Sequence, residues 1–199
     1  MAGVVVGGKT ARRRAGTGGA DVSGGVKRVV VFGPESTGKT TLARSLAGQI
    51  GEPWAEEFVR EFWEVKAGKI TAEDLGTIAL GQMASEDRAA ERAQQVVICD
   101  TDLLTCVLWN DLLFPGKCPE WVRAEAEARV RATDLFLFCD TDLAWAEDPQ
   151  RCFPDEAGRA MVRRVWREAM VGRGRPWVEV AGEGVEREAL AREALARLR

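Results

Sequence analysis

The 199-residue sequence contains no histidine and no tyrosine. Without histidine, the chain cannot build a Ser-His-Asp triad, a histidine-ligated zinc site or a histidine general base. Any proton transfer must therefore be carried by aspartate, glutamate, lysine or arginine. Without tyrosine, a flat ligand could stack only on tryptophan or phenylalanine, and the chain has seven of each.

Paired cysteines, a basic charge excess and long apolar runs are also missing. The five cysteines are scattered without a C-x-x-C pair, which favours reduced thiols in a cytoplasmic protein. The net charge of −3 argues against a broad nucleic-acid-binding surface. No apolar run approaches the ~20 residues that span a bilayer, and the first residues do not read as a secretory signal. We therefore expect a cytoplasmic protein without nucleic-acid or membrane partners; a homo-oligomer stays open.

Eight consecutive residues, GPESTGKT at 33–40, match every fixed position of the phosphate-binding loop G-x-x-x-x-G-K-[ST]. Residues 27–32 predict a buried strand before the loop, and residues 41–47 predict a helix after it. In this arrangement, backbone amides and a helix N-terminus surround a polyphosphate. Lys39 would reach the β- and γ-phosphates of ATP, and the Thr40 hydroxyl would bind Mg²⁺. The expected nucleotide-binding residues of the loop are Gly33, Glu35, Ser36, Thr37, Gly38, Lys39, Thr40 and Thr41.

The rest of the chain alternates between predicted strands and helices. This alternation predicts a three-layer α/β/α sandwich around a mostly parallel five-stranded sheet, formed by residues 27–199. The basic helix expected at 154–170 would be a small lid. Residues 1–26 would be a flexible tail, with a docking arm as the alternative. On the last helix, the expected buried side chains are Val185, Leu190, Leu195 and Leu198.

Carboxylates follow several predicted strands, at the sheet edge where ligands of such folds bind. Asp100 would hold Mg²⁺ through water, and capping the next helix is the alternative. Asp102 would accept a hydroxyl proton or bind ribose hydroxyls, or else it would complement the dipole of that helix. Asp140 and Asp142 end a later strand and are expected at the same edge.

A phosphate-binding loop alone does not separate kinases from GTPases, motors and switches. No N-K-x-D element of the kind that binds guanine is present, so adenine is favoured. The order of loop, acidic residues after the second and third strands, basic lid and last strand is that of nucleoside and nucleotide kinases. Such kinases act by positioning and charge neutralisation.

Four elements together resemble the ribosylnicotinamide (nicotinamide riboside) kinase domain of NadR-type proteins, in the wider group of AAA-type ATPase and kinase domains. GPESTGKT at 33–40 is similar to its G-x-E-S-x-G-K-[ST] loop, and EFVREF at 57–62 to its E-Y-x-R-E-[FY] element. DTDLLT at 100–105 resembles its D-T-D-x-x-T element, and WAED at 145–148 with Arg151 resembles its W-x-x-D-G-x-R element. The likeness covers about residues 27–182. It departs at Phe58, which replaces tyrosine, and at Pro149-Gln150, which replace glycine.

Glu57 follows the second strand, where small nucleoside kinases place the carboxylate that orients the attacking 5′-hydroxyl. We expect Glu57 to be the base, with a simple ion pair to Arg60 as the alternative. Arg60 would contact substrate or phosphate. Phe58, Trp63 and Trp109 are candidates for stacking on a flat ring, with core packing as the alternative for each.

Asp148 resembles a substrate-contacting carboxylate, whose charge would favour a cationic pyridinium riboside; a solvent-facing loop residue is the alternative. Among the arginines of the predicted lid, Arg151 and Arg159 are expected to neutralise charge on the transferred phosphoryl group. Arg163, Arg164 and Arg167 would form a solvated helix face. Closure of the lid would exclude water from the reaction.

The sequence thus predicts a kinase that transfers the γ-phosphoryl group of Mg-ATP to the 5′-hydroxyl of nicotinamide riboside and gives nicotinamide mononucleotide. Its alternatives are a kinase for another nucleoside or small metabolite, and a nucleotide-dependent regulatory ATPase or switch. The expected catalytic residues are Lys39, Glu57, Asp102 and Arg151. The expected acceptor-binding residues are Glu57, Phe58, Arg60, Asp102 and Asp148.

Overall fold

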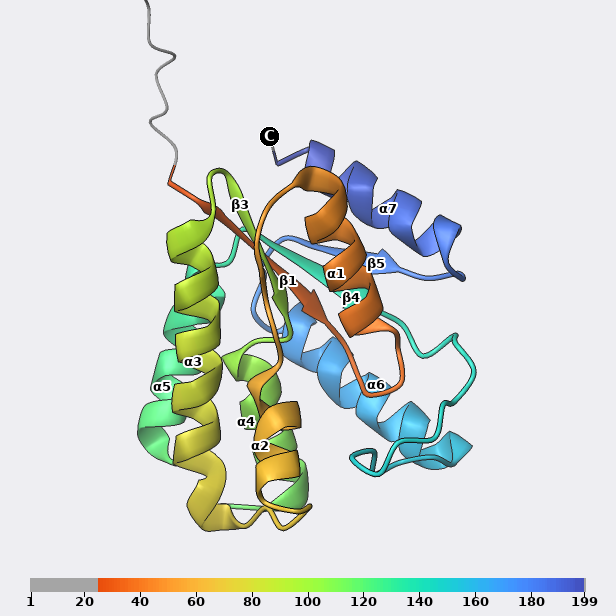
Figure 1. Cartoon of the computed structure of the whole chain (residues 1–199). Helices are drawn as coiled ribbons and strands as arrows, with labels where there is room; N and C mark the ends of the chain where they lie inside the picture. Colours follow the sequence, from red (N-terminus) through yellow and green to blue (C-terminus); the bar gives the residue numbers. More distant parts are fainter. Residues whose placement is uncertain (1–24, 199) are drawn as a thin grey trace, which may run out of the picture.

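The computed structural model describes residues 25–198, which form five strands and seven α-helices in three layers (Figure 1). The strands are β1 (Lys27–Phe32), β2 (Trp54–Ala55), β3 (Val96–Asp100), β4 (Leu135–Cys139) and β5 (Trp177–Val180). They lie in the order β2-β3-β1-β4-β5, and every neighbouring pair is parallel. The predicted α/β sandwich is confirmed, with a sheet that is wholly parallel.

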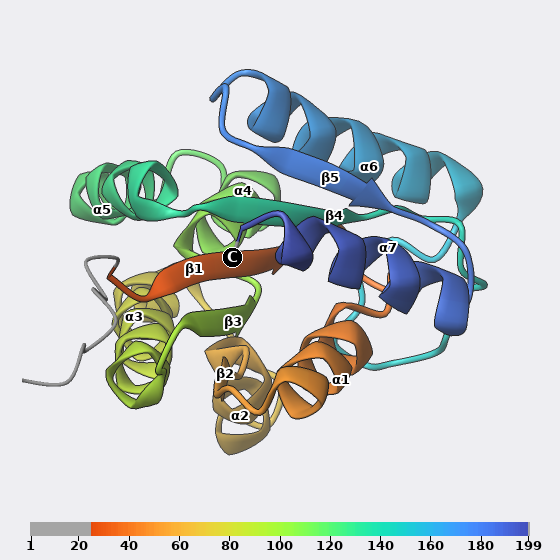
Figure 2. The same cartoon turned by 90° about the horizontal axis from the view of Figure 1, so that it is seen from above.

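Helices cover both faces of the sheet (Figure 2). Side chains alternate along β1, so Val29 and Val31 face one layer while Val30 and Phe32 face the other. The first layer consists of α1 (Lys39–Ile50) and α7 (Val185–Ala196). The second layer consists of α3 (Leu75–Arg92), α4 (Leu103–Leu113), α5 (Glu120–Ala132) and α6 (Glu156–Val171).

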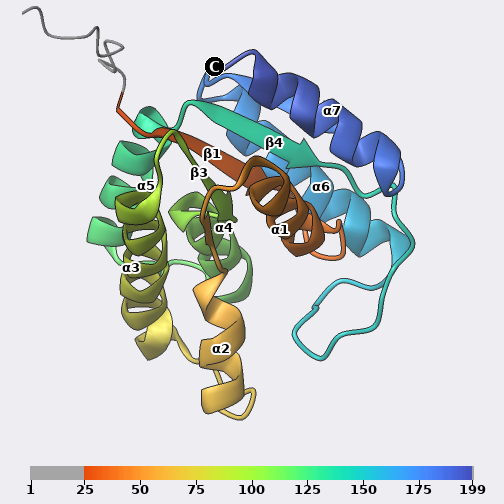
Figure 3. The same cartoon turned by 45° about the horizontal axis from the view of Figure 1, so that its top comes forward.

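The short helix α2 (Phe58–Val65) and the irregular segment 140–155 extend beyond the carboxyl ends of the strands (Figure 3). The segment 140–155 joins β4 to α6, and Arg60 of α2 bonds to Asp148 within it, at 3.3 Å. In doubly wound sheets this edge is where ligands bind. The loop after β1, the helix after β2 and the segment after β4 therefore surround one site.

The helix α6 is not the lid that the sequence predicts. Its residues Val162, Trp166 and Met170 are buried against the sheet, in the same core cluster as Phe136 of β4. The helix is therefore a fixed part of the second layer, and the segment 140–155 covers the phosphate-binding loop in its place.

The expected buried side of α7 is partly wrong. Val185 is 79% exposed and Leu190 is 40% exposed, whereas Leu195 is buried as predicted. The helix instead buries Arg187 together with Ala191, Ala194 and Leu195. Small alanine side chains let the helix lie close to the core, and this orientation takes Arg187 inward to the phosphate-binding loop.

The sequence also predicts a flexible N-terminal tail and no membrane-spanning segment. Nearly all of the predicted tail, residues 1–24, lies outside the described residues. No helix within residues 25–198 combines the length and the apolar character that crossing a membrane requires.

Candidate active site

The loop between β1 and α1 has the backbone of a phosphate-binding loop. Gly33 lies so close to β4 that a Cβ atom there would come within 2.5 Å of the Cys139 carbonyl oxygen. Gly38 has a φ of 73°, which strains any residue with a side chain. The Pro34 carbonyl oxygen accepts hydrogen bonds from the Thr37 hydroxyl at 2.8 Å and from Lys39 Nζ at 2.5 Å. These contacts fold the loop over the N-terminus of α1, where the helix dipole favours anions.

A cavity of about 240 Å³, called here the phosphate cavity, lies on this loop. Arg60 of α2 and Arg151 of the segment 140–155 also line it. Together with Lys39 they place three cations around a cradle that suits a polyphosphate. The loop residues that line it are the expected Ser36, Thr37, Gly38, Lys39, Thr40 and Thr41.

Asp100, at the end of β3, has a buried carboxylate whose two oxygens find no hydrogen-bond partner among the described residues. Burial raises the pKa of Asp100 to about 6, and the charge of Glu57 adds to this rise, while the charges of Lys39 and Arg60 oppose it. An unpaired buried carboxylate is costly unless it binds a cation.

The residues around Asp100 fit a magnesium ion. The Thr40 hydroxyl and the Asp100 carboxylate are the oxygen ligands that Mg²⁺ prefers. Within residues 25–198 there is no group of three or more histidine, cysteine or acidic side chains that could hold a metal ion. Mg²⁺ binds in other proteins through one or two protein oxygens and takes its other ligands from water and phosphate.

Asp102 caps the N-terminus of α4. Its carboxylate accepts hydrogen bonds from the Thr105 amide at 3.0 Å and from the Thr105 hydroxyl at 3.1 Å. Burial raises the pKa of Asp102 to about 6, although the bonds from Thr105 oppose the rise. Asp102 lines none of the three cavities described here. Asp102 is thus the residue that caps α4, the role considered as an alternative for Asp100, and a contact of Asp102 with a substrate hydroxyl stays a prediction.

Glu57 heads a charged network at the start of α2. Its Oε2 accepts a hydrogen bond from Arg60 Nε at 3.1 Å, and Arg60 also reaches Asp148. Arg151 lies 3.8 Å from the same Asp148 carboxylate. The Gln150 amide and the guanidinium groups of Arg60 and Arg151 hold the pKa of Asp148 below its usual range. Asp148 is therefore held in the site by two arginines. Glu57 makes the ion pair with Arg60 that was considered as its alternative, and it also lines a second cavity.

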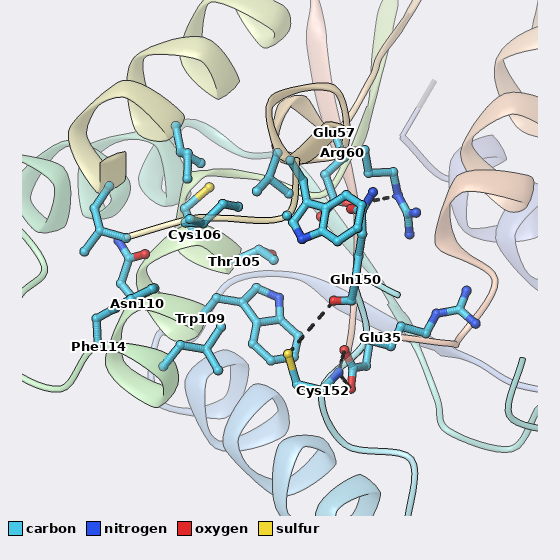
Figure 4. Close-up of a pocket in the computed structure, with 18 of the residues that line it drawn as sticks. Glu35, Glu57, Arg60, Thr105, Cys106, Trp109, Asn110, Phe114, Gln150 and Cys152 are labelled. Carbon is cyan, nitrogen blue, oxygen red and sulfur yellow. Dashed lines mark hydrogen bonds and ion pairs between the residues drawn. The ribbon is translucent and has the colours of Figure 1, made fainter. Parts of the chain in front are cut away.

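This second cavity, of about 420 Å³, is called here the acceptor cavity. Figure 4 shows Glu57 and Arg60 near one end, Asn110 and Phe114 near the other, and Trp109 between them. Trp63 also lines it, so two of the three candidate stacking rings lie in this cavity. Six further lining residues are apolar: Val59, Ile70, Leu75, Ile78, Cys106 and Leu113.

Phe58, the third candidate for stacking, lies outside the acceptor cavity. Its ring packs on Gly81 of α3, where an added Cβ atom would come within 2.2 Å of the ring. It lines a separate cavity of about 780 Å³ between α1, α2 and α3. The packing alternative therefore holds for Phe58, because α2 turns this side of its first turn toward α3.

Two residues expected to bind the nucleotide contact the segment 140–155 instead of lining the phosphate cavity. Glu35 accepts hydrogen bonds from the backbone amides of residues 152 and 153. Arg159 donates to the carbonyl oxygens of Thr141 and Leu143, at 2.8 and 2.7 Å. Their contact with ATP stays a prediction, and in this structure both residues hold the segment in place.

The carboxylates after β4 do not join Asp100. Asp140 accepts a hydrogen bond from Arg163 at 2.7 Å, and this contact lowers the pKa of Asp140 to about 2. Asp142 pairs with Arg187. Arg163 and Arg167 pair with carboxylates at the edge of the sheet, so the face that they form is less solvated than expected. Ion pairing thus turns these carboxylates away from the metal position.

Arg187 is a site residue that the sequence pattern does not reveal. Its side chain is 4% exposed and donates to the Thr37 carbonyl oxygen at 2.6 Å and to the Gly182 carbonyl oxygen at 3.0 Å. The ion pair with Asp142 completes its contacts. Arg187 therefore supports the phosphate-binding loop from α7, which lies 150 positions away in the sequence.

Replacement of Arg187 by methionine should destabilise the protein by about 2–4 kcal/mol, because it leaves Asp142 without its cation and the Thr37 carbonyl oxygen without its donor. Urea unfolding at pH 7.5 measures this difference. Arg192→Met is the matched control, since Arg192 is exposed on the same helix. A loss for Arg187→Met as small as that of the control would show that the loop does not depend on this support.

The phosphate and acceptor cavities meet at Lys39, Arg60 and Arg151, which line both. Glu57 lines the acceptor cavity beside this junction. A polyphosphate on the loop and a hydroxyl group in the acceptor cavity would therefore face each other across three cations and one carboxylate. This arrangement is suited to in-line transfer of a phosphoryl group.

The fold is similar to that of several solved kinase structures. NadR protein in complex with NR matches with a TM-score of 0.67 and 24% identity, over 86% of this chain and 50% of that chain. Thymidylate kinase from Ehrlichia chaffeensis matches with a TM-score of 0.60 and 14% identity, over 88% of this chain and 100% of that chain. Deoxyadenosine kinase from M. mycoides with bound dATP matches with a TM-score of 0.59 and 10% identity, over 85% and 99% of the two chains. The chain has the fold of P-loop kinases and spans about half the length of the NadR chain.

Sequence comparison gives the family. No curated protein sequence matches this chain. The family model described as an AAA domain matches residues 28–187, which include the phosphate-binding loop, Asp100 and the segment 140–155. The match covers well over half of the chain, and the chain therefore belongs to this AAA domain family.

Proposed function

We propose that the protein is a kinase that transfers the γ-phosphoryl group of ATP to the 5′-hydroxyl of nicotinamide riboside, giving nicotinamide mononucleotide. The observation that carries the proposal is the junction of the two cavities at Lys39, Arg60 and Arg151. A hydrolytic switch needs only the phosphate cavity and a water molecule. A separate apolar cavity with aromatic walls that opens onto the phosphates is the arrangement that a second substrate requires.

The chemistry of the acceptor cavity supports a cationic aromatic riboside. Trp63 and Trp109 offer ring faces, which attract a pyridinium cation as well as stacking on it. The Glu57 carboxylate lies toward the phosphate end, where the 5′-hydroxyl of a bound riboside would meet it. The NadR structure with a similar fold holds NR, and we extend that substrate to this chain as part of the proposal.

Each residue at the junction has a proposed task. Lys39, Arg60 and Arg151 would neutralise the phosphate oxygens, and Glu57 would orient the attacking hydroxyl and accept its proton. Thr40 and Asp100 would hold Mg²⁺, which neutralises and aligns the phosphates of bound ATP. The segment 140–155 would exclude water from the junction and so suppress hydrolysis.

A kinase for another nucleoside is the second candidate. The similar folds of the deoxyadenosine and thymidylate kinases favour it, since the names of those two proteins give other substrates. The apolar wall of the acceptor cavity and its two tryptophan rings could also hold another base.

Release of ADP from Mg-ATP, measured with one acceptor at a time, tests the proposal. The acceptors are nicotinamide riboside, adenosine, cytidine, uridine and thymidine, each compared with a reaction without acceptor and with one containing EDTA. We expect strong stimulation by nicotinamide riboside and none in EDTA. Stimulation by a different nucleoside would replace the substrate and keep the reaction. Slow release of ADP at the same rate with and without each acceptor would favour a regulatory ATPase.

Asn110 is expected to read the carboxamide of the acceptor. It is 6% exposed, and its Nδ2 donates to Cys118 Sγ at 3.5 Å, which directs its carbonyl oxygen away from that contact. It lies at the end of the acceptor cavity opposite Glu57 (Figure 4). Asn110→Leu should lower kcat/KM for nicotinamide riboside by about tenfold, the typical effect of one lost hydrogen bond. Nicotinic acid riboside, which has no amide N–H to donate, is the internal control and should lose no activity. An equal loss for both ribosides would contradict this assignment.

A further inference from the structure

Glu35 belongs to the phosphate-binding loop by sequence but to the acceptor cavity by position. It lines the acceptor cavity and not the phosphate cavity. Its carboxylate accepts hydrogen bonds from the Cys152 amide, at 3.0 Å to each oxygen, and from the Phe153 amide at 2.7 Å. Position 35 is one of the variable positions of the loop motif, so this side chain is free to serve another purpose than phosphate binding.

The segment that Glu35 holds forms one wall of the acceptor cavity. Gln150, Arg151 and Cys152 line that cavity, and Figure 4 shows Gln150 and Cys152 next to Glu35. Ser36 provides a second tie between the same two parts, because its hydroxyl oxygen accepts a hydrogen bond from the Ala146 amide at 3.1 Å. Two adjacent loop residues thus carry a wall that lies more than a hundred positions away.

We propose that Glu35 is a positioning residue that couples nucleotide binding on the phosphate-binding loop to closure of the acceptor cavity. The inference builds on the proposed kinase function. Phosphate groups on the loop would fix its backbone, and the backbone directs Glu35. Glu35 then fixes the amides of residues 152 and 153, and with them the position of Arg151, which lines both cavities. Such hydrogen bonds to a carboxylate are stronger than those between neutral groups.

Coupling of this kind is reciprocal, which makes it measurable. If nucleotide tightens acceptor binding by some factor, acceptor must tighten nucleotide binding by the same factor. For a link made by three hydrogen bonds to one carboxylate, we expect a factor of about five to thirty, within the usual range for coupled sites. Loss of the carboxylate should bring this factor close to one.

Calorimetric titration of nicotinamide riboside, with and without saturating Mg-AMP-PNP, measures the coupling factor in each variant. Glu35→Ala should lower the factor to about one. Glu35→Gln keeps one acceptor oxygen and should give an intermediate value, which separates hydrogen bonding from charge. Glu147→Gln is the matched control, since Glu147 is an exposed carboxylate on the same segment without a hydrogen bond or ion pair in the described part of the chain. A Glu35→Ala variant with the wild-type factor would overturn the proposal.

Amide hydrogen exchange of a peptide containing residues 152 and 153 gives a second readout that needs no acceptor. Mg-AMP-PNP should slow exchange at these amides by about tenfold in the wild type and in Glu147→Gln, and hardly at all in Glu35→Ala. A wild type that shows this protection but phosphorylates no riboside would sink the proposed function and leave the coupling in place. Equal protection in Glu35→Ala would reject the coupling itself. Thermal melting confirms that each variant is folded. If Glu35→Ala does not fold, Glu35→Gln replaces it in both measurements.

Discussion

Asp100→Asn is expected to remove almost all phosphoryl transfer while it stabilises the protein. Asparagine cannot offer the negative charge that Mg²⁺ and the phosphates require, so kcat should fall by about a hundred- to a thousandfold. The same charge is a burden in the protein without ligands, because the Asp100 carboxylate is buried and its oxygens have no hydrogen-bond partner among the described residues. A functional charge that lowers stability is typical of a site built to bind a cation.

The pH dependence of stability gives the sign of the effect. The pKa of Asp100 is raised to about 6 in the folded protein, whereas an unfolded chain has an ordinary aspartate value near 4. The folded state therefore binds more protons between these values, and stability falls as the pH rises from about 4 to about 6. Asp100→Asn should gain about 1–3 kcal/mol at pH 8 and almost nothing at pH 4.

Urea unfolding at both pH values and ADP release with the acceptor test these two effects together. Asp102→Asn is the informative comparison, because Asp102 is also buried and its pKa is also raised to about 6. Asparagine caps helices nearly as well as aspartate, so this variant should keep activity within about tenfold of the wild type. If Asp102→Asn lost the activity and Asp100→Asn kept it, the two roles would have to be exchanged.

Features that depend on neighbouring residues in the sequence could be predicted. The phosphate-binding loop follows from eight consecutive residues, and β1 occupies Lys27–Phe32 as its apolar, β-branched pattern indicates. Asp100 could be placed beside the loop because β1 and β3 are adjacent and parallel, so their carboxyl ends meet. Glu57 reaches the site for the same reason, at the end of β2.

Features that depend on long-range ion pairs could not be predicted. Asp140 and Asp142 follow a strand as Asp100 does. Nothing in the sequence indicates that they form ion pairs with Arg163 and Arg187. Periodicity along α7 favours the leucines as its buried side and hides a buried arginine. In each case a partner far away in the sequence decides where a polar side chain lies, and a single chain without related sequences carries no record of that partner.

The charged pair at the start of α2 leads to the second large expectation, a loss of about a hundred- to ten-thousandfold in kcat for Glu57→Gln. Glutamine keeps the size and one acceptor oxygen but cannot take a proton from the 5′-hydroxyl. KM for the acceptor should change little, because other side chains that line the cavity, among them Trp109, would hold the ring of the proposed substrate. Initial rates over a range of nicotinamide riboside concentrations, at saturating Mg-ATP, give kcat and KM separately.

The ion pair with Arg60 offers a competing explanation that the same experiment can separate. If Glu57 only holds Arg60, glutamine still accepts a hydrogen bond from Arg60 Nε, and kcat should fall by less than about tenfold. Arg60→Met would then be at least as slow as Glu57→Gln, and the double variant would be no slower than Arg60→Met alone. If Glu57 is the base, the double variant should be much slower than Arg60→Met alone. Glu64→Gln, an exposed carboxylate on the same helix, should behave as the wild type and so controls for the loss of one negative charge.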